Sequence, residues 1–300
     1  MTQYQFFRIV EMRTKIISMG TFFAALVYAF NLQGTIMLER AIIMLFATLC
    51  VDMGTTGFNT FFDYYHGVDN KEYTKEQEKV LVHEDVKPAY ALFVSLALFG
   101  LAALLGLYLA YLTSYGLIIV GSLCMLVGFF YTAGPLPISR TPFGELFAGA
   151  FLGSILFLIT LYTQDVPLNV GTVLVSMPFL LLIAMILSVN NGCDRIGDQA
   201  SGRRTLAILL GQRGAYILIA VEAFSAYALS LLLIILGYYP IIMAICTIFV
   251  ALQFEKSYKK VGKAGMSEEH KSKHMGFASQ TYLLYCLAFI LSFLIDSFMY

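Results

Sequence analysis

Two short polar motifs interrupt an otherwise apolar sequence, and each combines asparagine with aspartate at the spacing of a helical turn. The first motif is NTFFDYYHGVD at residues 59–69, and the second is NNGCDRIGD at residues 190–198. An asparagine precedes an aspartate by four residues in each motif, so the two side chains share one face of a helix. The polar residues are Asn59, Asp63 and Asp69 in the first motif, and Asn190 (or Asn191), Asp194 and Asp198 in the second.

Carboxylates gathered at the end of an apolar helix predict a cation site. Near lipid they are costly and normally face a protein-lined cavity, where several carboxylates repel one another unless a cation lies between them. Ligands that are all oxygen suit magnesium, which binds few protein carboxylates and completes its shell with water and substrate phosphates. The basic residues that follow the motifs are Lys71, Lys75, Lys79, Lys87, Arg195, Arg203 and Arg204. Acids for a metal and bases for phosphate oxygens together predict a diphosphate site.

Each of these polar features also has a structural interpretation. A single aspartate at a helix end is commonly a cap or an interfacial charge, whereas two matched motifs favour a shared site. Asp52 and Glu222 lie inside apolar runs and are equally consistent with polar contacts between helices. The lysines at 71–79 are mixed with glutamates, which is typical of a solvated loop.

The composition is that of an integral membrane protein. Of the 300 residues, 59% are hydrophobic and 13% are charged, with a mean hydropathy of +0.78, whereas soluble domains carry about 25% charged residues. Apolar runs of about 20 residues, the length of a membrane span, recur without the alternation of barrel strands and indicate helices. The first run lacks a small-residue cleavage site, so we expect it to remain as a membrane helix. The net charge of zero gives no electrostatic argument for a nucleic-acid partner.

The pattern of apolar runs predicts an all-α, polytopic membrane protein in which nine transmembrane helices bundle around a central cavity. The predicted helices are 15–33, 38–65, 88–112, 115–133, 142–162, 169–193, 214–236, 239–254 and 278–297. The longer polar connections are predicted at 66–87, 194–213 and 255–277. We expect Gly67 to end the second helix, and the sixth helix to stop near Gly192 or Gly197 or to continue through Asp198.

The basic residues predict an orientation in the membrane. With nine spans, Arg40 is the only one of 19 lysines and arginines that falls on one side, and all the others fall on the opposite side. Basic residues accumulate in cytoplasmic segments, so the N-terminus and the three long connections are predicted to be cytoplasmic. Both polar motifs then lie at the cytoplasmic ends of their helices, in a multi-pass protein of the plasma membrane.

The residues of both motifs resemble the two aspartate-rich motifs of the UbiA superfamily of intramembrane prenyltransferases. DRIGDQASGRRTLAILLG resembles the second of these with its trailing basic residues, threonine, leucine and glycine. YTAGPLPISRTPFGELFAGAFLG at residues 131–153 is similar to a segment of the MenA-like branch, which prenylates 1,4-dihydroxy-2-naphthoate in menaquinone biosynthesis. The resemblance implies one UbiA-like domain over residues 1–300, with a pseudo-repeat of helices 1–4 and 5–8 followed by helix 9.

The resemblance also implies roles for individual residues. Asp63, Asp69, Asp194 and Asp198 would hold Mg²⁺ against a prenyl diphosphate, with Asp63, Asp194 and Tyr131 as the residues of catalysis. The substrate-binding residues implied are Asn59, Asn190, Asn191, Arg195, Arg203, Arg204, Lys79 and Arg140. Asp52, Glu145, Glu222 and His83 receive no role.

The function implied is transfer of a polyprenyl group from prenyl diphosphate to 1,4-dihydroxy-2-naphthoate, with loss of carbon dioxide and pyrophosphate, giving demethylmenaquinol. We expect magnesium and basic residues to neutralise the leaving diphosphate, and Tyr131 to stabilise the allylic cation through its ring face. Prenyl transfer to another aromatic or quinone-precursor acceptor is the alternative within the superfamily. A membrane transporter is the alternative from another class, because transporters also carry carboxylates among interrupted helices.

Overall fold

The computed structural model of the chain describes residues 2–71, 74, 79–84 and 86–299, and all regular secondary structure within them is helical. The all-α class predicted from the sequence is therefore confirmed. Lys75, one of the basic residues that follow the first motif, lies outside the described residues.

Each predicted range coincides with a helical stretch of the structure. In chain order the elements are α1 Gln3–Ile9, η1 Met12–Lys15, α2 Ile16–Gln33, α3 Leu38–Tyr65, α4 Val80–His83, α5 Pro88–Leu112, α6 Gly116–Phe130, η2 Ile138–Arg140, α7 Gly144–Gly149, the π-helix η3 Ala150–Ile155, α8 Leu156–Thr163, α9 Val170–Ala200, α10 Leu206–Ile235, α11 Ile242–Ala264, η4 Glu268–His270 and α12 Lys271–Met299.

Seven helices in the described part of the chain are long and apolar enough to cross a membrane. They are Met12–Gln33, Leu38–Tyr65, Pro88–Leu112, Gly144–Thr163, Val170–Ala200, Leu206–Ile235 and Glu268–Met299. The apolar helix Gly116–Phe130 is shorter, and α11 becomes rich in lysine over its second half. These helices indicate a multi-pass membrane protein, and the count of nine spans stays a prediction.

The predicted connections at 194–213 and 255–277 were wrong, because helix occupies most of both ranges. α9 continues seven residues past the predicted end at 193, and α11 continues past 254 to Ala264. The apolar run marks where a helix leaves the lipid, whereas the backbone hydrogen bonds continue through polar residues of good helix propensity. α10 begins early, at Leu206, and has a kink at Gly211, whose φ is 69°.

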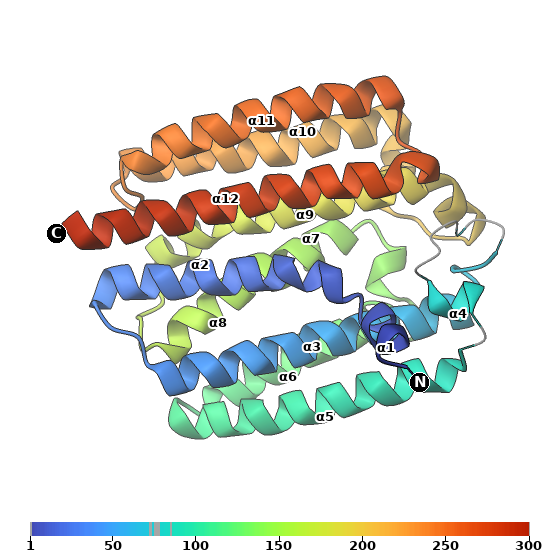
Figure 1. Ribbon diagram of the computed structural model, residues 1–300, viewed down its shortest axis with the longest axis horizontal. Coiled ribbons are helices and arrows are strands. Elements are labelled where there is room, and N and C mark those ends of the chain that lie inside the picture. Colours follow the sequence, from blue (N-terminus) through green and yellow to red (C-terminus); the bar gives the residue numbers. More distant parts are fainter. Residues whose placement is uncertain (1, 72–73, 75–78, 85, 300) are drawn as a thin grey trace. The chain divides into compact units, whose positions relative to one another are not determined.

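The chain divides into two compact units. Unit 1 contains Met1–Ile16, Ile42–Gly144 and Ile196–Thr205, and thus α1, most of α3, α4, α5, α6 and the end of α9. Within this unit α5 packs against α6, and α1 packs against α4 (Figure 1). A small apolar core joins α1 and α4 to the start of α5 through Ile9, Val80, Leu81 and Ala91.

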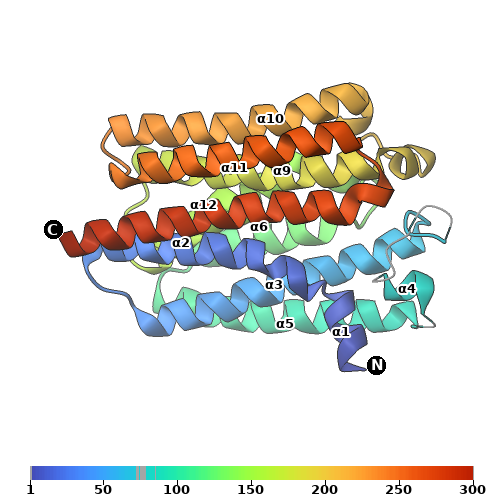
Figure 2. The same cartoon turned by 45° about the horizontal axis from the view of Figure 1, so that its top comes forward.

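Unit 2 contains Ile17–Ala41, Glu145–Arg195 and Leu206–Tyr300. Within it α11 packs against both α10 and α12, and the three helices run side by side in Figures 1 and 2. Its core is rich in fully buried aromatic rings, among them Phe157, Phe179, Tyr285 and Phe289. Such rings contribute large apolar areas to the packing, so unit 2 has the larger of the two cores.

Candidate functional site

The chain turns back at the end of α3 and brings Asp69 next to Asp63, the other acid of the first motif. Gly67 has a φ of 71°, a backbone conformation that glycine adopts without steric cost. The backbone N–H groups of Val68 and Asp69 both donate to the Asp63 carbonyl oxygen, at 2.8 and 3.0 Å. This is a glycine-ended helix terminus, and it confirms the prediction that Gly67 ends the helix.

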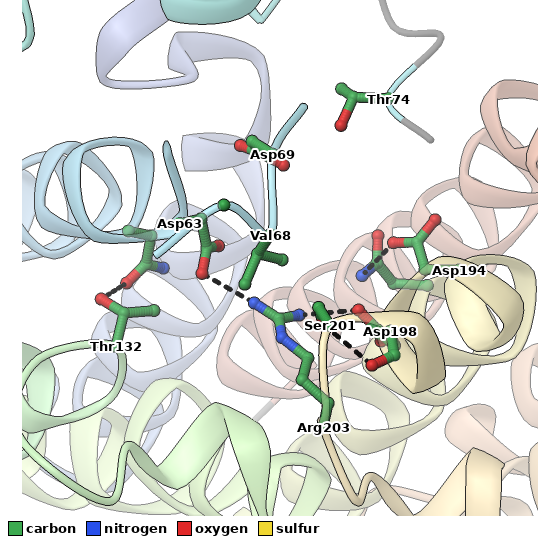
Figure 3. Close-up of polar contacts among 12 residues, drawn as sticks. Asp63, Val68, Asp69, Thr74, Thr132, Asp194, Asp198, Ser201 and Arg203 are labelled. Carbon is green, nitrogen blue, oxygen red and sulfur yellow. Dashed lines mark hydrogen bonds and ion pairs between the residues drawn. The ribbon is translucent and has the colours of Figure 1, made fainter. Parts of the chain in front are cut away.

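Arg203 lies between one carboxylate from each motif (Figure 3). Its Nη2 is 2.7 Å from Asp63 Oδ1, and its Nη1 is 3.1 Å from Asp198 Oδ1. The Asp63, Asp198 and Arg203 side chains are 19%, 4% and 10% exposed. Burial alone would lower the pKa of the Arg203 guanidinium, but Asp63 and Asp198 outweigh burial and raise it. Two acids that are distant in sequence thus share one positive charge.

A turn after α9 holds Arg203 in this position. Asp198 lies in the last turn of α9, as one of the two sequence interpretations predicts. Gly202 then has a φ of 78°, and the Arg203 backbone N–H donates to the Asp198 carbonyl oxygen at 3.0 Å. The Arg204 N–H donates to the Arg140 carbonyl oxygen at 2.9 Å, which ties this turn to η2.

Asp69, the second acid of the first motif, has a lysine beside it. Lys79 Nζ is 3.4 Å from Asp69 Oδ2 and 3.0 Å from Glu11 Oε1. The sequence identified Lys79 and Asp69 as candidates but did not single out Glu11. Glu11 precedes the first predicted helix, and no motif connects it with Lys79.

Asn59 and Tyr131 are positioned by contacts near the end of α6. Thr132 is buried and donates its hydroxyl to Asn59 Oδ1 at 2.8 Å. The Tyr131 hydroxyl donates to the Gly144 carbonyl oxygen at 3.5 Å. Thr132 directly follows Tyr131, so one short segment contacts Asn59 and positions Tyr131. No sequence pattern singles out Thr132.

In unit 2, the two asparagines of the second motif have different hydrogen-bond partners. Asn190 Nδ2 donates to Asp194 Oδ2 at 3.2 Å, whereas Asn191 Nδ2 donates to Glu145 Oε1 at 2.9 Å. Lys271 Nζ at the start of α12 also donates to Asp194 Oδ2, at 2.8 Å. Sequence reasoning missed Lys271 because it lies in a polar segment 77 residues beyond the acid.

The other predicted basic residues lie differently. Arg195 and Arg140 are half-buried, and Arg204 is exposed. Within the described residues, these three arginines form no ion pair with a carboxylate. The structure therefore brings Arg203 and Lys79, of the predicted basic side chains, to the acids.

The donor chemistry of the acids fits a magnesium ion. Among the described residues, no group of three or more His, Cys, Asp or Glu side chains lies close enough together to hold a metal ion. Magnesium nevertheless needs only one or two carboxylates when water and substrate phosphates complete its shell. Asp63, Asp69 and Asp198 offer oxygen ligands only, and Arg203 and Lys79 supply positive charge to them.

Asp52, which received no role, forms a buried ion pair in unit 1. Lys15 Nζ is 2.6 Å from Asp52 Oδ1 and also donates to the Thr56 hydroxyl at 2.5 Å. The Lys15 and Asp52 side chains are 4% and 13% exposed. The pair joins the segment before α2 to α3, and it is the polar contact that the structural interpretation of Asp52 describes.

Comparison of the sequence with known proteins identifies related chains. The model of the UbiA prenyltransferase family matches residues 18–280. A 1,4-dihydroxy-2-naphthoate octaprenyltransferase of Bacillus subtilis is 39% identical over 194 residues, which cover 65% of this chain and 62% of that protein. A Mycobacterium tuberculosis protein of the same name is 28% identical over 57% of this chain and 58% of its own length. The matches thus span less than two thirds of these two bacterial relatives.

A vertebrate relative and two solved structures extend the comparison. The UbiA prenyltransferase domain-containing protein 1 of Danio rerio is 25% identical over 77% of this chain and 68% of its own length. A UbiA homologue from Archaeoglobus fulgidus, bound to DMAPP and Mg²⁺, superposes with a TM-score of 0.67 at 12% identity, over 96% of this chain and 99% of that one. A digeranylgeranylglyceryl phosphate synthase gives a TM-score of 0.66 at 20% identity, over 97% and 98%. These structural likenesses show a shared fold.

Proposed function

Because this chain belongs to the UbiA prenyltransferase family, we propose that it transfers a polyprenyl group from prenyl diphosphate to 1,4-dihydroxy-2-naphthoate. Carbon dioxide and pyrophosphate are the other products, and the resulting demethylmenaquinol belongs to menaquinone biosynthesis. The observation that carries the proposal is Arg203, which bridges Asp63 of the first motif and Asp198 of the second. The choice of acceptor is supported by the 39% identity to the Bacillus subtilis naphthoate enzyme.

The acids are proposed to hold Mg²⁺ and the basic residues to bind the diphosphate. Asp63, Asp69 and Asp198 are the ligand candidates in unit 1, and Asp194 lies one turn before Asp198 on α9. When bound, magnesium would act as a Lewis acid that neutralises charge on the phosphate oxygens. Arg203, which balances two of these acids in the structure, is then free to donate to the diphosphate, where a guanidinium fork matches phosphate oxygens.

The remaining residues orient the reacting groups. The allylic C–O bond breaks with its electron pair leaving on the diphosphate, and the electron-rich naphthoate ring attacks the allylic carbon. The carboxylate of the acceptor then leaves as carbon dioxide, and its electron pair restores the aromatic ring. Tyr131 supplies an aromatic face for the positive charge that develops on the allyl group. Asn59 and Asn190 are proposed to contact the substrate. Hydrogen bonds with Thr132 and Asp194 hold their amides in place.

We further propose the setting of this reaction in the cell. The chain crosses the plasma membrane nine times as a single domain with an internal pseudo-repeat, and the helices enclose an apolar cavity for the prenyl tail. The acidic motifs face the cytoplasm, because magnesium and diphosphate are soluble ions. The distribution of lysine and arginine along the sequence supports this orientation.

Isosteric replacement of the acids tests the proposed activity. Asp63→Asn and Asp194→Asn are each expected to lower kcat/KM by about 100- to 1,000-fold, the cost of removing an electrostatic group from a transition state. Product formation is measured by mass with purified protein, Mg²⁺, a prenyl diphosphate and 1,4-dihydroxy-2-naphthoate. Asp165→Asn is the matched control, because Asp165 is an exposed partner of Arg40 with a φ of 58° that asparagine tolerates. Full activity of either motif variant would overturn the assignment.

The same assay decides between this proposal and its alternatives. A panel of aromatic acids and quinone precursors identifies the acceptor by the mass of the prenylated product. Release of pyrophosphate that depends on magnesium, a prenyl diphosphate and an acceptor separates a transferase from a transporter. If another aromatic acid is turned over in preference to the dihydroxynaphthoate, the proposed acceptor is wrong, and the proposed prenyl transfer still stands.

A further inference from the structure

A second polar cluster is buried inside unit 2, and the reaction outlined above leaves it unused. It consists of Glu145 on α7, Ser188 and Asn191 on α9, and Glu222 on α10. These four residues are 2%, 1%, 6% and 8% exposed. Asn191 Nδ2 donates to Glu145 Oε1 at 2.9 Å, and Glu222 on α10 lies near Ser188 and Glu145. Three helices thus direct polar groups to one buried place.

Several polar atoms of this cluster lack partners. Within the described residues, Glu145 Oε2, Glu222 Oε2 and Ser188 Oγ are buried and have no hydrogen bond. The Ser188 hydroxyl is near Glu222 without the geometry of a hydrogen bond to it. A buried polar group without a partner costs about 1–3 kcal/mol, and more if it is charged. Three such atoms in one cluster are available to a ligand that brings matching hydrogen-bonding groups.

The kind of ligand follows from the charge of the cluster. Two buried carboxylates that lie near each other repel when both are ionised, so the pair favours a ligand that donates hydrogen bonds to it. Neither glutamate forms an ion pair with a lysine or arginine in the part of the chain that the structure describes. A carboxyl pair with open acceptor oxygens is complementary to a group with O–H donors. A phenol with two hydroxyl groups matches both carboxyl groups.

The cluster overlaps the start of the second motif on α9, because Asn191 belongs to both. Asn191 precedes Asp194 by three residues, a rise of about 4.5 Å along the helix, toward its apolar part. The segment after α7 packs closely on α9: a Cβ on Gly153 would lie 2.6 Å from the Leu180 backbone nitrogen. The π-helix η3 follows α7 directly, and π-helical segments occur frequently at functional sites.

We propose that Glu145 and Glu222 bind the hydroxyl groups of the aromatic acceptor and that one carboxylate of the pair accepts a phenolic proton. This inference rests on the proposed function. The phenolic O–H bond breaks, the proton bonds to the carboxylate oxygen, and the electron pair stays on the phenolate and enriches the ring that attacks the allylic carbon. After carbon dioxide has left, the carboxylic acid returns the proton to the phenolate, so the site is unchanged over one cycle.

Steady-state kinetics of glutamine variants test the site. Glu145→Gln and Glu222→Gln are expected to raise KM for 1,4-dihydroxy-2-naphthoate by about 10- to 100-fold, the equivalent of one hydrogen bond to a charged group. KM for the prenyl diphosphate should stay within about twofold. Glu255→Gln is the matched control, because Glu255 is an exposed partner of Lys259, and it should behave as the unmodified protein. A changed KM for prenyl diphosphate with an unchanged KM for the acceptor would overturn the proposal.

A binding measurement separates this inference from the proposed function. Without magnesium or prenyl diphosphate, 1,4-dihydroxy-2-naphthoate should raise the melting temperature of the unmodified protein more than 2-naphthoate, which lacks both hydroxyl groups. The glutamine variants should lose this difference between the two ligands. Ser188→Ala is a smaller change and should reduce the difference. It provides the test if the glutamine variants do not fold. A hydroxyl-dependent shift without any turnover would retain the site and refute the transferase. Turnover that is sensitive to Asp63→Asn, with equal shifts for both ligands, would retain the transferase and refute the site.

Discussion

Arg203 occupies the place between two carboxylates that a metal ion would otherwise neutralise. Its guanidinium contacts Asp63 at 2.7 Å and Asp198 at 3.1 Å. Removal of one partner from a buried ion pair leaves the remaining charge without compensation and typically costs 3–5 kcal/mol. Under the proposed function this side chain has two uses: it stabilises the acids without magnesium, and it donates to the diphosphate when magnesium is bound.

Arg203→Gln should expose this double use in a measurement of stability. Without magnesium, we expect the variant to lose about 3 kcal/mol, the lower end of that range because Asp63 keeps some exposure. Magnesium should restore about 2 kcal/mol or more, because it binds an acid pair that no guanidinium neutralises. Thermal unfolding in detergent across a magnesium titration measures both effects.

The control for this experiment is Arg213→Gln on α10, where the arginine is exposed. It should leave both the stability and its dependence on magnesium unchanged. If magnesium stabilises Arg203→Gln no more than the unmodified protein, the guanidinium does not stand in for the cation.

Lys271, like Arg203, is expected to bind the prenyl diphosphate. Its Nζ is 2.8 Å from Asp194 Oδ2, one of the proposed magnesium ligands, so under the proposed function it lies close to the phosphates. Lys271→Met should raise KM for the prenyl diphosphate about tenfold, the loss of one charge-assisted hydrogen bond. The neighbouring exposed Lys273 gives the control variant Lys273→Met. Equal KM values of the two variants for the prenyl diphosphate would show that Lys271 does not contact this substrate.

At the scale of residues, sequence reasoning found the acids more reliably than their partners. Asp63, Asp194 and Asp198 stand out because carboxylates are rare in apolar helices. Their basic partners are chosen by the fold: Arg203 meets Asp63 across 140 residues of sequence. Lys271 was one lysine among many, and Thr132 is a small polar residue whose contact with Asn59 leaves no pattern in the sequence.

At the scale of elements, the apolar runs predicted where helices exist and the exact bounds of α3 and α5, but not the ends of α9 and α11. A run of apolar residues records the thickness of the lipid, whereas a helix continues as long as its backbone bonds and propensities allow. α9 therefore carries Asp198 past the predicted end at 193. The short helices α1 and α4 and the π-helix η3 were not predicted, because packing rather than local composition determines them.

The packing of η3 on α9 gives a prediction for a single helix contact. A Cβ on Gly153 would lie within 2.8 Å of three backbone atoms of Phe179 and Leu180, and backbone atoms cannot rotate away. Gly153→Ala should therefore destabilise the protein by about 1–3 kcal/mol, the usual cost of overpacking. Gly100→Ala on α5 is the control, because nothing lies within 4 Å of its added Cβ. Thermal unfolding that shows Gly153→Ala to be as stable as Gly100→Ala would contradict this close contact.

At the scale of the whole molecule, the unequal distribution of basic residues predicts the orientation in the membrane. Lysine and arginine are retained on the cytoplasmic side during insertion, and Arg40 alone is assigned to the other side. Thr35 in the connection between α2 and α3 should then lie outside, and Lys260 on α11 should lie inside. Both residues are exposed, so each position accepts a cysteine as a reporter.

Labelling of single cysteines in intact cells tests this orientation. In a background with the five native cysteines replaced by alanine, Thr35→Cys should react with a membrane-impermeant maleimide, and Lys260→Cys should react only after lysis. The cysteine-free background is the control and should not be labelled. The reverse pattern would place the basic segments outside, where lysine and arginine would meet no cytoplasmic magnesium or diphosphate. An outside location of Lys260 would therefore refute the proposed orientation, and with it the access of a soluble diphosphate group from the cytoplasm.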